Sequence, residues 1–97
     1  MPEQKEILSS LKRYYHQYKD LYGIEEIGIF GSYARGNATP SSDIDIFVRL
    51  RYSSLLILSR IRLELEELFG IHTDIVQLRE RMNPYLKRHI EQESIRV

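Results

Sequence analysis

The stretch from Asp43 to Leu50 alternates strictly between two kinds of side chain. One set of alternate positions is aliphatic: Ile44, Ile46, Val48 and Leu50. The other set holds Asp43, Asp45, Phe47 and Arg49. Because successive side chains of a β-strand point to opposite faces, this pattern predicts a strand with one buried face. The chain must therefore form a sheet and cover one of its faces with other elements.

Two segments, one on each side of this strand, have the spacing of amphipathic helices. In the first, apolar residues recur every three or four positions over Ile7–Tyr22, and Gly23 is the expected left-handed end. The second starts after Ser53 or Ser54, either of which can cap it, and ends at Gly70. Its expected core stripe is Leu58, Ile61, Leu65, Leu68 and Phe69.

Shorter patterns complete the predicted elements. The runs Ile27–Phe30 and Ile71–Leu78 are rich in strand-forming residues and predict two further strands. Asn83-Pro84 predicts the start of a last helix, since Asn caps well and Pro fits the first helical position. After Glu93, a short strand and a frayed end both remain open. Helices that alternate with strands predict an α/β or α+β fold in which helices flank a small sheet.

Composition narrows the class of protein. A length of 97 residues predicts one domain spanning residues 1–97. Hydrophobic residues make up 42% and charged residues 29%, and no apolar run approaches the roughly 20 residues of a membrane helix, so we expect a cytoplasmic protein. The 14 basic and 14 acidic residues cancel, which argues against nucleic acid as the main partner. So small a core would gain from a protein partner or from homo-oligomer formation.

Two acidic residues stand at the start of the predicted central strand, where Asp is disfavoured. Asp43 and Asp45 are two positions apart, so they share one face with Cα atoms about 6.5–7 Å apart. Carboxylates this close repel each other unless a cation lies between them, and Mg²⁺ prefers carboxylate and phosphate oxygens. The pair therefore suggests a metal site. The alternative is that Asp43 caps a loop end and Asp45 lies on a solvated face.

A glycine motif precedes the acidic pair. Gly31-Ser32 follows a predicted buried strand and opens a predicted helical turn that runs to Gly36. Such a turn directs backbone N–H groups and a hydroxyl at one point, which suits a phosphate, and Gly31 lets the backbone approach a ligand closely. By itself, Gly-Ser after a strand is usually a simple turn. Its occurrence together with Asp43 and Asp45 favours a functional site.

Together these residues resemble a known signature. Gly31-Ser32-Tyr33-Ala34-Arg35-Gly36, followed by Ser42-Asp43-Ile44-Asp45, resembles the motif of the nucleotidyltransferase superfamily typified by DNA polymerase β. The short chain is similar to the minimal nucleotidyltransferases of prokaryotes. The resemblance covers roughly Ile24–Leu78. It implies a mixed sheet with flanking helices, ATP or another nucleoside triphosphate as donor, and Mg²⁺ or Mn²⁺ as cofactor.

The superfamily uses a third carboxylate on a neighbouring strand, and the resemblance implies Asp74 for this position. Asp74 is also the only acid inside its apolar run, although an acid at a strand edge can simply face water. By the resemblance, Asp43 and Asp45 hold the metal ions that bind the triphosphate. Asp74 then completes a second metal site and helps to deprotonate the attacking hydroxyl, as in other two-metal sites.

The resemblance also implies the nucleotide-binding residues Gly31, Ser32, Arg35 and Gly36, with Ser32 and nearby N–H groups on the β- and γ-phosphates. For Arg35, contact with a phosphate and plain solvation both remain open. His72 shares a strand face with Asp74, so two interpretations stay open: a proton-handling role, and a side chain that is merely packed or partly exposed.

The resemblance further implies an enzyme that transfers AMP from ATP, with a HEPN-domain toxin as partner and the chain as antitoxin. The three aspartates favour activity. The alternative is a weak or inactive binding module that neutralises its partner by contact. Modification of one of the chain's own tyrosines also stays open.

Two groups of side chains allow opposite interpretations. One is a row of aromatic rings: Tyr14, Tyr15, Tyr18 and Tyr22. Either the rings supply core area while their hydroxyls reach water, or they form a surface that binds a partner. The other is a basic group: Arg49, Arg51, Arg60 and Arg62. Either these arginines lie near the entrance of the proposed site, or they form an ordinary solvated face.

Overall fold

A computed structural model of the chain describes residues 2–97. Its elements are α1 (Gln4–Tyr22), β1 (Ile24–Phe30), α2 (Gly31–Arg35), β2 (Ile44–Leu50), α3 (Leu55–Phe69), β3 (Thr73–Gln77), α4 (Pro84–Glu93) and β4 (Ile95–Arg96). The four strands form one sheet in the order β3-β2-β1-β4. β2 and β3 are parallel, whereas β1 is antiparallel to both β2 and β4. The expected small mixed sheet with flanking helices is confirmed.

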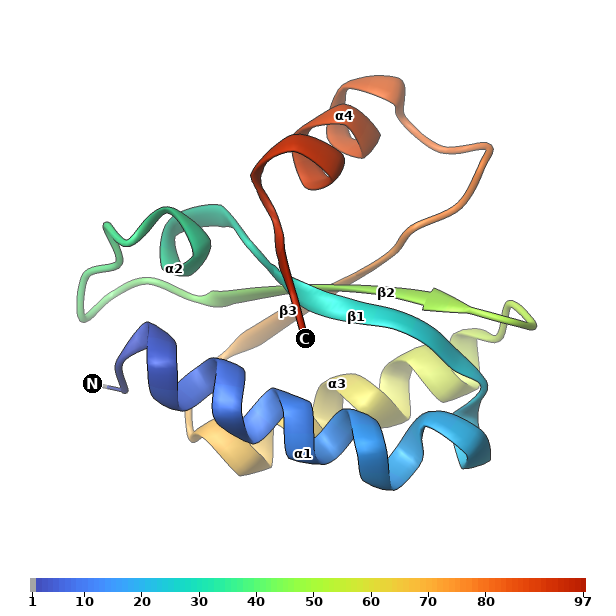
Figure 1. The fold of residues 1–97 in the computed structure, drawn as a ribbon, viewed down its shortest axis with the longest axis horizontal. Coiled ribbons are helices and arrows are strands. Elements are labelled where there is room, and N and C mark those ends of the chain that lie inside the picture. The colour runs from blue at the N-terminus through green and yellow to red at the C-terminus, as the bar shows by residue number, and fades with distance from the viewer. Residues whose placement is uncertain (1) are drawn as a thin grey trace.

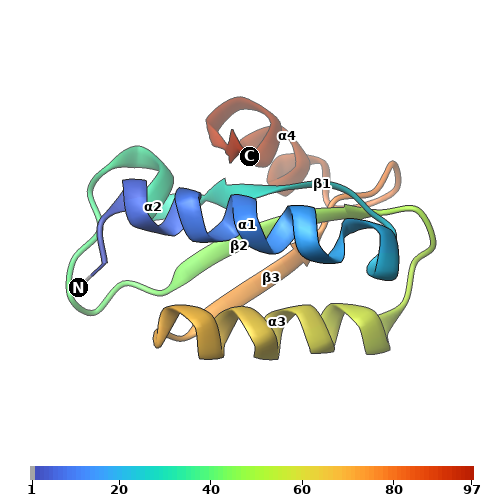
Figure 2. The ribbon, with the colours of Figure 1, turned by 60° about the horizontal axis from the view of Figure 1, so that its bottom comes forward.

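The helices cover the sheet from two sides. Figure 1 shows α1 and α3 on one face and α4 on the other, and Figure 2 shows the same layers from a second direction. The face under α1 and α3 carries the main core, in which the aliphatic side of β2 is buried as predicted. The buried aliphatic residues of this cluster are Ile7, Leu11, Ile24, Ile27, Ile29, Ile44, Ile46, Val48, Leu50, Ile61 and Leu65.

A second, smaller cluster lies under α4. It consists of Phe30, Phe47, Leu78 and Ile90. Gly28 leaves room for the Phe47 ring of this cluster and for β4, because a side chain at Gly28 would collide with that ring and with the carbonyl of Ile95. This cluster covers only part of the sheet face. Asp43 stays exposed and Asp45 half-buried at the start of β2.

The helix ends follow the local signals in the sequence. Gly23 and Gly70 end α1 and α3 in the left-handed conformation, each with φ 68°. Of the two serines that could cap α3, Ser54 does so, accepting a hydrogen bond from the backbone N–H three residues later at 3.2 Å. Asn83 caps α4 through its side-chain oxygen, and Pro84 is the first residue of that helix.

The strand ends differ from the predictions. β1 begins at Ile24 rather than Ile27, because an irregularity in the pairing between Ile24 and Glu26 breaks the alternation that would have revealed it. β3 is shorter than the predicted run, and β2 begins one residue later than Asp43. Residues 95–96 form a strand that pairs with β1, which decides between the two alternatives for the chain end.

The prediction of a core position in α3 is wrong for one residue. Leu68 remains 50% exposed, because it lies at the gap between α3 and α1 rather than against the sheet. Among the described residues, no helix is long and apolar enough to cross a membrane.

Candidate active site

Strand pairing brings three aspartates to one end of the sheet. Asp45 lies opposite Phe30, the last residue of β1, and beside Asp74 in the parallel pair of β2 and β3. Asp43 directly precedes β2 and is on the same side of the strand as Asp45. Paired residues on neighbouring strands share a face, so the three carboxylates lie on the side of the sheet that α4 only partly covers.

The outer part of the cluster has the donor set of a metal site. Asp43, His72 and Asp74 are exposed, and each offers a ligand atom within 4.8 Å of the others. Carboxylate oxygens suit Mg²⁺ or Mn²⁺, and an imidazole nitrogen suits Mn²⁺ better than Mg²⁺. The residues present therefore fit a divalent cation.

Asp45 lies deeper and in a less favourable environment. Burial raises the pKa of its carboxyl, and the negative charges of Asp74 and Asp43 raise it further. The positive charges of Arg35 and His89 act in the opposite direction. A cation bound among the three acids would relieve this repulsion.

The glycine motif is packed against Asp45. Gly31 has φ 74°, a backbone conformation that residues other than glycine rarely adopt. In addition, a Cβ atom on Gly31 would overlap the Oδ2 atom of Asp45. Gly31 is thus required twice, by its backbone conformation and by the carboxylate beside it. The two halves of the sequence motif are in direct contact.

The short helix α2 carries the rest of the motif along the edge of the cluster. Tyr33 anchors it in the core and is only 3% exposed. Gln4 fixes it from α1, since its side-chain amide donates to the carbonyls of Tyr33 and Ala34 at 2.8 and 3.1 Å. α2 ends at Gly36 with φ 78°. Ser32 and Arg35 therefore sit on a firmly held turn next to the acids.

His72 links the cluster to α3. Its Nε2 lies 3.2 Å from Asp74 Oδ1, and its Nδ1 lies 3.2 Å from Glu66 Oε1. The hydrogen bond to Glu66 is the main reason that the pKa of His72 is raised. The ring is exposed, so proton handling and a merely partly exposed side chain both stay open for His72. The geometry makes His72 a support for the Asp74 carboxylate.

The structure brings in His89, a residue for which no role was predicted from the sequence. Its ring meets the Phe30 ring edge-on at 6.3 Å between centroids, and its Nδ1 lies 2.7 Å from Glu93 Oε2. His89 and Glu93 are four residues apart on a helix, a spacing visible in the sequence. What the sequence could not show is that α4 lies over the same sheet face as Asp45.

Arg49 and Arg62, two members of the basic group noted in the sequence, pair with acids other than the three aspartates. Arg49 lies four residues beyond Asp45 along β2 and pairs with Glu26 at 3.2 Å. Arg62 pairs with Glu66 within α3. Both pairs are partly solvated, which supports the solvated-face interpretation of this group.

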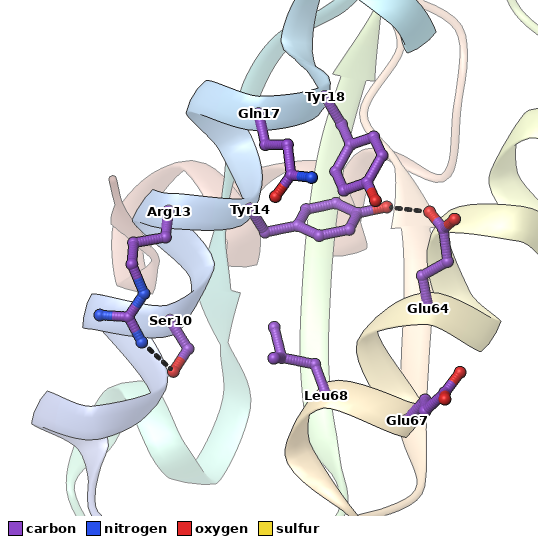
Figure 3. A pocket seen from close by; sticks show the side chains of 8 residues that line it. All are labelled: Ser10, Arg13, Tyr14, Gln17, Tyr18, Glu64, Glu67 and Leu68. Atoms are coloured by element: carbon purple, nitrogen blue, oxygen red, sulfur yellow. Dashed lines mark hydrogen bonds between the residues drawn. The ribbon is translucent and has the colours of Figure 1, made fainter.

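A separate hollow of about 410 Å³ lies between α1 and α3, on the face away from the aspartates. Figure 3 shows Tyr14, Tyr18 and Glu64 around it, with the Tyr14 hydroxyl directed at the Glu64 carboxylate. The hollow shares no residue with the carboxylate cluster.

Comparison with known proteins defines the class. The nucleotidyltransferase domain family matches residues 5–97. A candidate protein adenylyltransferase of Methanocaldococcus jannaschii is 38% identical over 100 residues, which cover 100% of this chain and 97% of that protein. Protein adenylyltransferase MntA of Thermococcus cleftensis is 40% identical over 73 residues, or 74% of each chain. The protein is a nucleotidyltransferase.

Comparison with solved structures shows to which group of nucleotidyltransferases the chain belongs. A candidate minimal nucleotidyltransferase superimposes with a TM-score of 0.78 at 30% identity, covering 97% of this chain and 95% of that one. In a complex of a tri-AMPylated HEPN toxin with an MNT antitoxin from Shewanella oneidensis, one chain superimposes with a TM-score of 0.71. It is 18% identical, with 96% of this chain and 70% of that one covered, so it shows the fold alone. The chain belongs to the minimal nucleotidyltransferases.

Proposed function

We propose that this chain transfers AMP from ATP to a hydroxyl group on a partner protein, and that the partner is a HEPN-domain toxin which the modification neutralises. We expect the reaction in the cytoplasm, where ATP is available. The observation that carries the proposal is the contact of Gly31 with Asp45: the glycine turn that we propose binds phosphate lies against a cluster of three carboxylates. Relatives named protein adenylyltransferases support a protein acceptor.

Asp43, Asp45 and Asp74 would hold a divalent cation, Mg²⁺ or Mn²⁺. When bound, the cation supplies positive charge that stabilises phosphate oxygens during displacement. The burial of Asp45 and the mutual repulsion of the three acids fit this role, because both are relieved by a cation.

The remaining residues orient the donor and the acceptor. The Ser32 hydroxyl and the N–H groups of α2 would bind the β- and γ-phosphates, with Arg35 adding charge. The acceptor oxygen attacks the α-phosphorus, the bond from that phosphorus to the bridging oxygen breaks, and pyrophosphate leaves. Asp74, held by His72, would accept the proton of the attacking hydroxyl.

The test is intact-mass measurement of a purified HEPN-domain partner after incubation with the chain, ATP and Mg²⁺. We expect the partner to gain the mass of AMP, and Asp45→Asn to reduce the rate by at least about 100-fold. Asp20→Asn is the matched control, since Asp20 is exposed on α1. Equal transfer by wild type and Asp45→Asn would refute the proposed site.

A contact-only antitoxin is the second candidate. Large apolar side chains stay exposed on the outside of the molecule, as a protein-binding surface would require: Leu55, Leu56 and Leu63 of α3. Under this candidate, Asp45→Asn neutralises the toxin as well as wild type does and no mass is gained. A toxin assay on the same samples distinguishes the two.

A further inference from the structure

α4 forms a second wall beside the carboxylate cluster. α2 and α4 are in contact, and both lie at the end of the sheet where β1 gives way to the glycine motif. The side of α4 that faces the sheet carries His89 and Ile90, which contact Phe30 and the second core cluster respectively. α4 is therefore held at this position by burial rather than by flexible surface contacts.

Phe30 places the imidazole of His89 close to the reactive groups. Phe30 is directly followed by Gly31, and it is the residue paired with Asp45 across β1 and β2. Directly paired residues have Cβ atoms about 5 Å apart on the same face. The His89 imidazole contacts the Phe30 ring, and Phe30 is the neighbour of both Asp45 and Gly31. Only the Phe30 side chain therefore separates His89 from the acids and from the proposed phosphate-binding turn.

Glu93 fixes which nitrogen is available. The Glu93 carboxylate lies 2.7 Å from Nδ1 of His89, one helical turn away, and so sets the orientation of the ring. Nε2 is then the nitrogen free to meet a ligand. The side chain of His89 is 33% exposed, so it is anchored and still accessible.

The charges around the cluster match a polyphosphate. Arg35 on α2 and His89 on α4 both lie near enough to act on the charge of Asp45, and they approach it from two different helices. A bound nucleoside triphosphate carries several negative charges that need partners beyond the cations held by carboxylates.

We propose that His89, oriented by Glu93, binds the β- and γ-phosphates of the nucleotide and the pyrophosphate that leaves. His89 acts as a phosphate ligand and Glu93 as a positioning residue. This inference rests on the proposed nucleotide site and adds to it a phosphate contact from α4.

The test is calorimetric titration of ATP, pyrophosphate and AMP into the full chain with Mg²⁺ present. His89→Phe keeps an aromatic ring on Phe30 but removes the nitrogens, so stability should be retained. We expect ATP and pyrophosphate to bind about tenfold more weakly, whereas AMP, which lacks the outer phosphates, binds as before. Glu93→Gln should weaken ATP binding less, at an unchanged melting temperature.

Arg88→Ala is the matched control, since it removes a full positive charge from an exposed position of the same helix. It should leave ATP affinity within about twofold of wild type. The inference is overturned if His89→Phe binds ATP as wild type does, if it loses ATP and AMP equally, or if Arg88→Ala has the same effect. Absence of any Mg²⁺-dependent ATP binding by the wild type would refute the proposed nucleotide site itself, and this inference with it.

Discussion

Two partly buried carboxylates on opposite faces of the sheet have opposite surroundings. Glu64, on α3, accepts hydrogen bonds from the hydroxyls of Tyr14 at 2.8 Å and Tyr22 at 2.9 and 3.0 Å. Asp45, at the start of β2, has two other acids for neighbours, and burial raises its pKa. One carboxylate is satisfied within the chain, and the other is partly buried beside two like charges.

This contrast separates stability from function. Burial and the bond to Glu64 raise the pKa of Tyr14 far above its ordinary value, so its hydroxyl remains a permanent donor, and Tyr22 behaves in the same way. Groups whose charge or hydrogen-bonding capacity is not satisfied within the chain are instead found most often at functional sites. The hydrogen bonds to Glu64 therefore stabilise the fold, whereas the burial of Asp45 among like charges opposes it.

The first and last tyrosines of the row on α1 belong to the core. The rings of Tyr14 and Tyr18 lie 4.7 Å apart, and those of Tyr18 and Tyr22 stack at 5.2 Å. Tyr14 and Tyr22 are buried. Their rings supply core area as expected, but the expectation that their hydroxyls reach water is wrong, because Glu64 receives them.

Removing the satisfied carboxylate should have the largest effect on stability. Glu64→Ala leaves two buried hydroxyls without their acceptor, and we expect a loss of about 3 kcal/mol in the free energy of unfolding. Urea titration measures this loss. Glu67→Ala, an exposed position on the same helix, should cost less than about 0.5 kcal/mol. Mg²⁺-dependent ATP binding by the folded variant should be unchanged, and a lost ATP site would break the proposed separation.

The contact between Gly31 and Asp45 can be isolated with two glycine variants. Both Gly31 and Gly36 have positive φ, but only a Cβ on Gly31 meets a neighbour, the Asp45 carboxylate. Gly36→Ala should cost about 1 kcal/mol for its backbone alone. Gly31→Ala should cost about 2 kcal/mol and also abolish ATP binding, as measured by urea titration and calorimetry. Equal costs for the two would show that Asp45 is not held against the motif.

Removing the unsatisfied carboxylate should raise stability by a smaller amount. In the folded chain without metal, the pKa of Asp45 is raised, so the ionised form is disfavoured. This penalty develops as the pH rises from the usual Asp pKa of about 3.9 through the raised value. Asp45→Asn should therefore be more stable than the wild type at pH 7, and equally stable near pH 3. Thermal unfolding in a chelator measures this, and added Mg²⁺ should stabilise only the wild type.

The sequence alone determined features that depend on neighbouring residues. The ends of α1 and α3 follow from glycines that adopt the left-handed conformation, and the two faces of β2 follow from strict alternation. The start of α4 follows from Asn83-Pro84. The pair Asp43 and Asp45 was also visible, because two acids on one strand face are local information. Asp74 was found through the resemblance of the whole motif.

Only the tertiary structure decided which distant groups meet. The Glu64 acceptor lies 50 residues from Tyr14, and no local pattern encodes that pairing. Asp74 lies beside Asp45 only because β2 and β3 pair in parallel, which no local pattern encodes. His89 approaches the site only because α4 lies across Phe30. Periodicity shows which side of an element is buried, but the partner that buries it depends on strand order and on helix placement. Both are set by long-range packing, in which many weak contacts act together.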